Sequence, residues 1–304
     1  MRIIVLFAFL HTLTFSVSVN AQTFGGVGTR AEGMAGAFVA VADDASAVYW
    51  NPAGIATGAT FDLMVAKGPD SGLFVGAALP VLGASYYETR EAAGLPTVST
   101  SDGRDNGGSG KVPIGAFTTT NFGVTVVQTV APGLVIGTTA RVVTGGTEGG
   151  ERRTTGDLDA GAMMSFWRMR FGVTARNLIQ PKFETGDGEV QLKRQYRVGA
   201  ALTPRALPTG VHGPFSLAFD ADLTTTPDVR GARRRAAAGG EYWIAKGFVG
   251  VRAGVGWSTL GERDVAFSGG GTAKLPRSIY VDGQLTKWND SDEDSWTIAA
   301  RVTF

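Results

Sequence analysis

Hydrophobic and polar residues alternate without a break over the last ten residues of the chain. One face of the expected strand carries apolar side chains, at Trp296, Ile298, Ala300, Val302 and Phe304. The other face carries small and polar side chains, at Thr297, Ala299, Arg301 and Thr303. A repeat of two residues is the period of a β-strand. A final strand that ends on an aromatic residue is typical of bacterial outer-membrane barrels, whose assembly machinery reads that strand. We therefore expect such a barrel, with the assembly machinery as a partner.

The same alternation recurs from about residue 60 to the end of the chain. It predicts fourteen strands, with boundaries good to about 2–4 residues, at 60–66, 73–80, 82–90, 114–130, 134–145, 156–166, 169–178, 194–204, 214–225, 233–245, 247–258, 264–273, 277–288 and 294–304. The predicted fold is all-β, a 14-stranded antiparallel transmembrane barrel over residues 60–304.

The connections between these strands are of two kinds, which alternate. One kind is short, such as Pro80-Val81 and Trp167-Arg168, whereas the other is longer and rich in Gly, Asp and Ser, as in residues 91–113 and 179–193. Short periplasmic turns and longer outer loops are typical of outer-membrane barrels. A soluble sandwich would alternate in the same way. We favour the barrel because the polar faces are richer in Gly, Ala and Thr than in Lys and Glu.

The N-terminus predicts export. Arg2 is followed by an apolar stretch and by Val19-Asn20-Ala21, which has the small residues of a cleavage site, so residues 1–21 are expected to form a signal peptide. The alternative is an N-terminal membrane helix, which the polar residues within the stretch disfavour. Beyond it, no apolar run is long enough for a spanning helix, so the chain has to cross the lipid as a closed sheet. We expect localisation in a Gram-negative-type outer membrane, in contact with its lipid, after cleavage near Ala21.

Charge and composition exclude several classes of function. Without Arg2 the basic residues number 27, equal to the 27 acidic ones, and this balance argues against nucleic acid as a partner. The chain has no cysteine, which excludes disulfides, thiol catalysis and cysteine-bound metal. His212 has no visible catalytic partner, and Asp43-Asp44 lacks the rest of a calcium loop. We expect no enzyme activity, no cofactor and no metal.

The residues before the barrel, 22–59, do not show the alternation of the strands. The run from Arg30 to Ala56, RAEGMAGAFVAVADDASAVYWNPAGIA, resembles the N-terminal block of the FadL-like outer-membrane proteins, especially the short members grouped with PorV and PorQ. Weaker similarities are Arg176-Asn177-Leu178 and residues 220–223 and 239–243. The resemblance implies a fourteen-stranded barrel with residues 22–59 as a hatch inside it.

Several candidate site residues follow from this resemblance and from the strand pattern. The resemblance assigns a hatch or gating role to Asn51, Pro52, Ala53 and Gly54. A transport route beside the hatch would be lined by Phe38, Val48, Tyr49 and Trp50. The inward strand faces predict a network of paired charges in the lumen, since buried charge is costly unless paired, at Arg141, Arg170, Arg176, Arg197, Asp220, Asp222, Glu241, Arg252, Asp282 and Arg301. Aromatic residues near strand ends predict an interfacial girdle, at Trp167, Tyr242, Trp243, Trp257, Trp288, Trp296 and Phe304.

Two functions remain open from the sequence. The first is passage of small hydrophobic compounds across the outer membrane, with such a compound as ligand. The longest predicted loop, residues 91–113, is mostly Gly, Ser, Thr and Asp, so it offers little surface to capture a long fatty acid. The second is a docking or shuttle role in protein secretion or surface attachment, as the likeness to PorV and PorQ suggests, with a secreted protein as partner.

Overall fold

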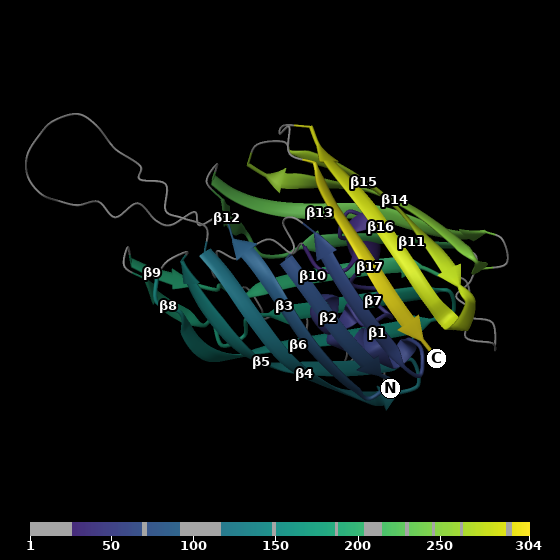
Figure 1. The fold of residues 1–304 in the computed structure, drawn as a ribbon, viewed down its shortest axis with the longest axis horizontal. Helices are drawn as coiled ribbons and strands as arrows, with labels where there is room; N and C mark the ends of the chain where they lie inside the picture. The colour runs from purple at the N-terminus through teal and green to yellow at the C-terminus, as the bar shows by residue number, and fades with distance from the viewer. Residues whose placement is uncertain are drawn as a thin grey trace, which may run out of the picture.

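A computed structural model describes most of the chain (Figure 1). The described residues are 26–68, 72–91, 117–147, 150–185, 188–203, 215–228, 231–244, 247–261, 264–289 and 294–304. The predicted signal peptide, the cleavage site near Ala21, His212 and nearly all of the loop 91–113 lie outside these residues. Within them, no helix is both long and apolar enough to cross a membrane.

Fourteen antiparallel strands form a closed barrel, as the alternation predicted. They are β1 (Asp62–Gly68), β2 (Gly72–Leu79), β3 (Leu82–Glu91), β4 (Phe117–Ala131), β5 (Leu134–Thr147), β6 (Arg153–Phe166), β7 (Met169–Arg176), β10 (Gln195–Leu202), β11 (Phe215–Asp222), β13 (Gly231–Ile244), β14 (Val249–Leu260), β15 (Val265–Leu275), β16 (Ile279–Trp288) and β17 (Ser295–Thr303). Each strand pairs with its neighbours in the chain, and β1 pairs with β17 to close the ring, with Val65 opposite Ala300.

Three short strands and a turn lie outside this ring. Within residues 179–193, which were predicted to be a long connection between strands, β8 (Lys182–Thr185) and β9 (Gly188–Gln191) form a separate hairpin. β12 (Thr226–Asp228) pairs with the start of β13. The turn η4 (Pro276–Ser278) joins β15 to β16. Such local pairings were missed because four-residue strands give too short a pattern to detect.

The barrel wall has the expected two faces. On β17, Trp296 and Ile298 are about half exposed, whereas Thr297 and Ala299 are buried. The exposed apolar face is the one that a transmembrane barrel turns to lipid. Two members of the predicted girdle are exceptions. Trp243 and Trp288 share the inward face of their strands, where Trp243 donates its Nε1–H to Glu241 at 2.9 Å and Trp288 lies 4.5 Å from the Arg235 guanidinium.

An N-terminal stretch lies inside the barrel, and we call residues 26–60 the inner segment. It contains α1 (Thr29–Gly33), α2 (Ala47–Trp50) and the 3-10 helix η2 (Pro52–Thr57). α1 contacts β14 to β17, while η2 contacts β4 to β6 on the other side of the ring, so the segment crosses the lumen (Figure 1). Every residue from 37 to 55 is buried. The core of the protein is therefore the contact between this segment and the inward face of the wall.

Candidate functional site

The turn at Asn51 fixes the inner segment to itself and to the wall. Asn51 has extended backbone, and its Oδ1 accepts the Ala53 N–H at 3.2 Å, which caps η2. Its Nδ2 donates to the backbone oxygens of Val39 at 2.9 Å and Ala162 of β6 at 3.1 Å. Pro52 begins η2, where its missing N–H is not needed. One side chain thus joins the two halves of the segment and one strand of the barrel.

Three glycines of the wall face this turn and residue Val39. Gly137 of β5 lies opposite Gly161 of β6, and Gly172 of β7 lies opposite Met163, two residues along β6 from Gly161. A Cβ on Gly137 would lie 2.5 Å from the carbonyl carbon of Pro52, and one on Gly161 would collide with the Asn51 amide oxygen. A Cβ on Gly172 would lie 2.6 Å from the Val39 oxygen. These three glycines, which we call the glycine wall, let the inner segment approach the backbone of the strands closely. The fourth predicted gating residue, Gly54, packs instead against the backbone of Ala42 within the inner segment.

On the opposite side, an arginine of the inner segment forms the main ionic contact. Arg30 Nε lies 2.8 Å from Glu241 Oε2 of β13, and Arg30 Nη1 lies 2.5 Å from Asp43 Oδ1. Burial alone would lower the pKa of Arg30, but the carboxylates around it, first Asp43 and then Glu241, hold the pKa above its ordinary value. Arg30 therefore stays charged, and the cluster is a fixed ion pair.

A second wall carboxylate binds the backbone of the inner segment. Asp220 Oδ2 of β11 accepts the N–H groups of Phe38 at 2.9 Å and Val39 at 2.8 Å. Beside it, Arg197 of β10 pairs with Asp222 at 2.6 Å and donates to the Gly36 carbonyl at 3.2 Å. The predicted pair Asp220 and Asp222 thus holds the backbone of the inner segment and Arg197.

The remaining predicted charges also lie in the lumen and are paired. Arg252 Nη2 binds Asp282 at 2.8 Å, and its Nη1 lies 3.4 Å from Glu241. Arg301 lies 3.7 Å from both Asp44 and Asp62. Arg170 lies 3.5 Å from Asp43, and Arg141 pairs with Asp157 and, at 2.8 Å, with Asp159. The structure therefore brings the predicted charges together in groups around the wall, several of which include residues of the inner segment.

Six members of these groups were absent from the charge network predicted from the sequence: Arg30, Asp43, Asp44, Asp62, Asp157 and Asp159. The first three stand in the block that carried the family resemblance, so they were visible, but their partners in the barrel wall lie far from them in the sequence. The ion pair between Arg30 and Glu241 joins positions 211 residues apart. Spacing along the chain gives no signal for such a pair.

The four residues predicted to line a route are closely packed. Phe38 and Trp50 meet edge to face, with ring centroids 6.1 Å apart, and Trp50 Nε1 donates to the Val27 carbonyl at 2.7 Å. Phe38, Val48 and Trp50 are at most 2% exposed. A ligand-lining role for them stays a prediction, and it requires the inner segment to move.

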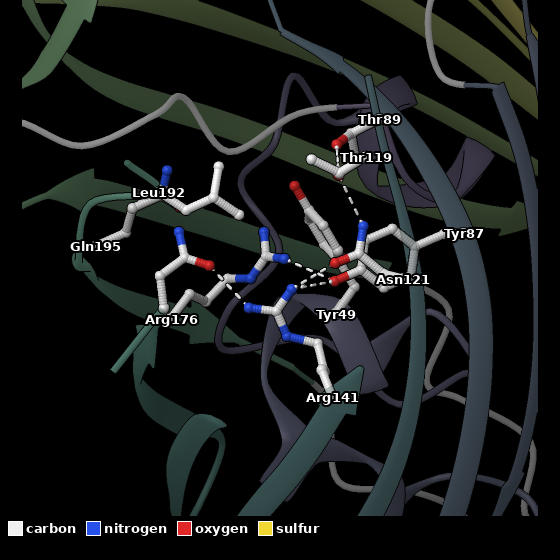
Figure 2. A pocket seen from close by; sticks show the side chains of 10 residues that line it. Tyr49, Tyr87, Thr89, Thr119, Asn121, Arg141, Arg176, Leu192 and Gln195 are labelled. Atoms are coloured by element: carbon white, nitrogen blue, oxygen red, sulfur yellow. Dashed lines mark hydrogen bonds between the residues drawn. The ribbon is translucent and has the colours of Figure 1, made fainter. Parts of the chain in front are cut away.

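Tyr49 instead lines a small cavity between α2 and the ends of β3, β4, β7 and β10 that lie away from the chain's C-terminus (Figure 2). Its wall includes Tyr87, Asn121, Arg141, Arg176 and Gln195, and its volume is about 20 Å³. Arg176 stacks on the Tyr49 ring, 3.7 Å from the centroid. The cavity is therefore polar and about the size of one water molecule. Within the described residues, no group of three or more His, Cys, Asp or Glu side chains could hold a metal ion.

The comparisons with known proteins agree on the fold. CymD, a monoaromatic hydrocarbon channel, superposes with a TM-score of 0.63 at 12% identity over 93% of this chain and 99% of that one. The Ralstonia pickettii toluene transporter TbuX gives a TM-score of 0.60 at 13% identity over 92% and 98%. The Pseudomonas putida toluene transporter TodX gives 0.57 at 12% over 93% and 99%. The fold is that of an outer-membrane β-barrel, shared with these FadL-family channels over nearly the whole length of each chain.

Comparisons of the sequence add little to the comparison of folds. A family model described as "F plasmid transfer operon, TraF, protein" matches residues 146–222, which is 77 of the 304 residues. The comparison with curated proteins gives no match. A special closeness to the PorV and PorQ members is not shown.

Proposed function

We propose that this protein is an outer-membrane channel through which small hydrophobic compounds pass, with the inner segment as the part that moves. The observation that carries the proposal is a segment that fills the lumen of a barrel whose fold matches that of hydrocarbon channels from end to end. At 12–13% identity the match supports the type of protein and leaves the solute open.

The packing of the inner segment determines how passage would work. Residues 37 to 55 are buried, and ion pairs and backbone hydrogen bonds tie the segment to β6, β11 and β13. A hydrophobic solute needs a continuous apolar or open path, which this arrangement blocks. Passage therefore requires part of the segment to shift, and the turn at Asn51 to Gly54 is the gate we assign to it, because it bears on a smooth glycine wall.

A channel also accounts for the rest of the molecule. The charged residues of the lumen are used in pairing, which fits a structural role for them and gives no acid–base pair for an enzyme. The alternative of a docking component for a secreted protein has no support from the comparisons. Export of the protein further requires removal of residues 1–21. Mass spectrometry of the membrane-inserted protein tests this step, and we expect it to find Gln22 as the mature N-terminus.

Uptake into liposomes tests the proposed function. Radiolabelled toluene is added to vesicles that carry the purified barrel and to empty vesicles. Both kinds of vesicle contain a trapped apolar acceptor phase, and the amount of label inside them is measured over time. A rate above that of empty vesicles is expected. Equal rates across a panel of small apolar compounds would refute the proposal, provided that the inserted barrel resists protease and migrates as a folded species.

A further inference from the structure

A polar patch lies on the outward face of the barrel, just beyond the apolar band. On β4, Phe122 is an exposed apolar residue of this face, and Thr120 and Thr118 lie beyond it toward the start of the strand. On β5, exposed Val142 is followed on the same face by Thr144. The longer connections, such as the one between β3 and β4, lie at this end of the barrel, and longer loops face the outside in outer-membrane barrels. The patch therefore stands where the head groups of the outer leaflet begin.

Arg152 lies across β4 and β5 at this patch and makes three hydrogen bonds. Its Nη1 donates to the Thr118 hydroxyl at 3.2 Å, and its Nη2 donates to the Thr120 hydroxyl at 3.0 Å and to the Thr144 carbonyl at 3.2 Å. Gly146 of β5 makes room for the side chain, since a Cβ there would lie only 3.1 Å from Arg152 Cγ. The strands thus hold the guanidinium against the outside of the wall.

The positive charge of Arg152 has no carboxylate partner among the described residues. Arg153, the next residue, points away from the patch by strand alternation and pairs with Glu184 of β8 at 3.3 Å. Glu88 of β3 shares the outward face, but it accepts the Tyr86 hydroxyl at 2.8 Å and forms no ion pair with Arg152. An arginine has five N–H groups, of which Arg152 uses three in the bonds above. The patch therefore offers a held cation with free donors to the surroundings of the barrel.

We propose that this patch binds the phosphate group of a lipid in the outer leaflet. Arginine suits phosphate because its planar group of N–H donors fits the phosphate oxygens and the bonds between them are strengthened by charge. The hydroxyls of Thr144 and Thr154 lie 2.8 Å apart, and only one of them donates to the other, so this face keeps a further hydroxyl proton as a donor. The inference goes beyond the proposed function and does not depend on the passage of a solute.

The position of the patch favours a lipid over a soluble anion. Phe122 and Val142 are about half exposed directly below Thr120 and Thr144 on the same strands. Acyl chains that cover these apolar residues carry a head group to the level of Arg152, so one molecule gains both apolar contact and a charge-assisted hydrogen bond. A free phosphate ion gains only the second.

Binding of two lipids that differ only by a phosphate group tests the inference. Radiolabelled phosphatidic acid, or diacylglycerol with the same acyl chains, is mixed with the tagged, folded barrel in maltoside micelles, which contain no phosphate. The label that stays with the barrel on affinity beads gives the two affinities. Phosphatidic acid is expected to bind at least about tenfold more tightly than diacylglycerol. Arg152→Gln is expected to weaken phosphatidic acid binding about tenfold, because it removes the charged donor, and to leave diacylglycerol binding unchanged.

Two further variants separate a built site from general attraction by charge. Arg153→Gln removes the same charge from the adjacent residue, which points away from the patch, and is expected to leave phosphatidic acid binding unchanged. Thr120→Val keeps the charge of Arg152 but removes a hydroxyl that holds it, and is expected to weaken phosphatidic acid binding several-fold. Equal losses in Arg152→Gln and Arg153→Gln, or equal affinities of the unchanged barrel for the two lipids, would overturn the inference. Displacement of phosphatidic acid by an equal concentration of inorganic phosphate would also overturn it, because the site would then bind a soluble anion.

Discussion

Arg30 of the inner segment and Glu241 of β13 form an ion pair at two points, Nε to Oε2 at 2.8 Å and Nη2 to Oε1 at 3.0 Å. Both side chains are at most 5% exposed. Glu241 also accepts from Trp243 at 2.9 Å, so its position is fixed from a second side. This pair holds the α1 end of the inner segment, as Asn51 holds the η2 end.

Glu241→Gln is expected to destabilise the protein. The change removes the charge that faces Arg30 and Arg252, and a buried cation that loses its partner costs about 2–4 kcal/mol. Urea unfolding of the refolded barrel in micelles, followed by tryptophan fluorescence, measures the loss. Glu184→Gln is the control, because Glu184 pairs with Arg153 at 3.3 Å on the surface with 74% of its side chain exposed. Its cost should be below about 1 kcal/mol, and equal costs would contradict a special role for the buried pair.

Gly161→Ala is expected to displace the turn at Asn51. The added Cβ would collide with the Asn51 amide oxygen and lie 2.9 Å from Pro52 Cδ, so the turn has to retreat from the wall. Gly156→Ala is the matched control in the same strand, since a Cβ there meets nothing within 4 Å. Hydrogen exchange at the amide of Ala53 should rise in the first variant and stay the same in the second. Unchanged protection in Gly161→Ala would show that the turn does not depend on the glycine wall.

The sequence predicted the wall of this protein better than its interior. Strands such as β17 can be predicted because a face in lipid and a face in the lumen impose a period of two, which is visible in a single sequence. The partner of Arg30 cannot be predicted in this way, because it depends on how fourteen strands close around the inner segment. Trp243 was misassigned to the lipid girdle for a related reason. Its place near a strand end suggested an interface, but its parity with Glu241 puts it inside.

Phe304→Ala is expected to reduce assembly of the barrel in cells. Phe304 is 70% exposed and stacks on Phe61 with centroids 6.1 Å apart, and the two residues exchange backbone hydrogen bonds at 2.9 and 3.1 Å. Phe61→Ala removes the same stacking but keeps the terminal aromatic residue. If assembly machinery reads Phe304, the first variant lowers the amount of heat-modifiable protein in the outer membrane several-fold, and the second does not. Equal losses would mean that the ring contact matters and recognition does not.

The double variant Ala35→Cys with Gly256→Cys is expected to lock the inner segment to β14. A Cβ built on Gly256 lies 3.7 Å from the Ala35 Cβ, which suits a disulfide, and the chain has no cysteine of its own to interfere. If the α1 end of the inner segment shifts together with the gate when a solute passes, the oxidised protein should lose most of its toluene uptake in liposomes.

Reduction should restore uptake in the locked protein, which separates the lock from damage caused by the two substitutions. Each single variant is the control and should be insensitive to oxidant, since one thiol cannot form the intramolecular bond. Non-reducing gel mobility confirms the link before uptake is measured. Ala35 follows α1, whereas the gate we assign lies at η2. Full uptake with the disulfide formed would therefore show that a solute passes without movement at α1. The moving part would then be confined to the turn from Asn51 to Gly54.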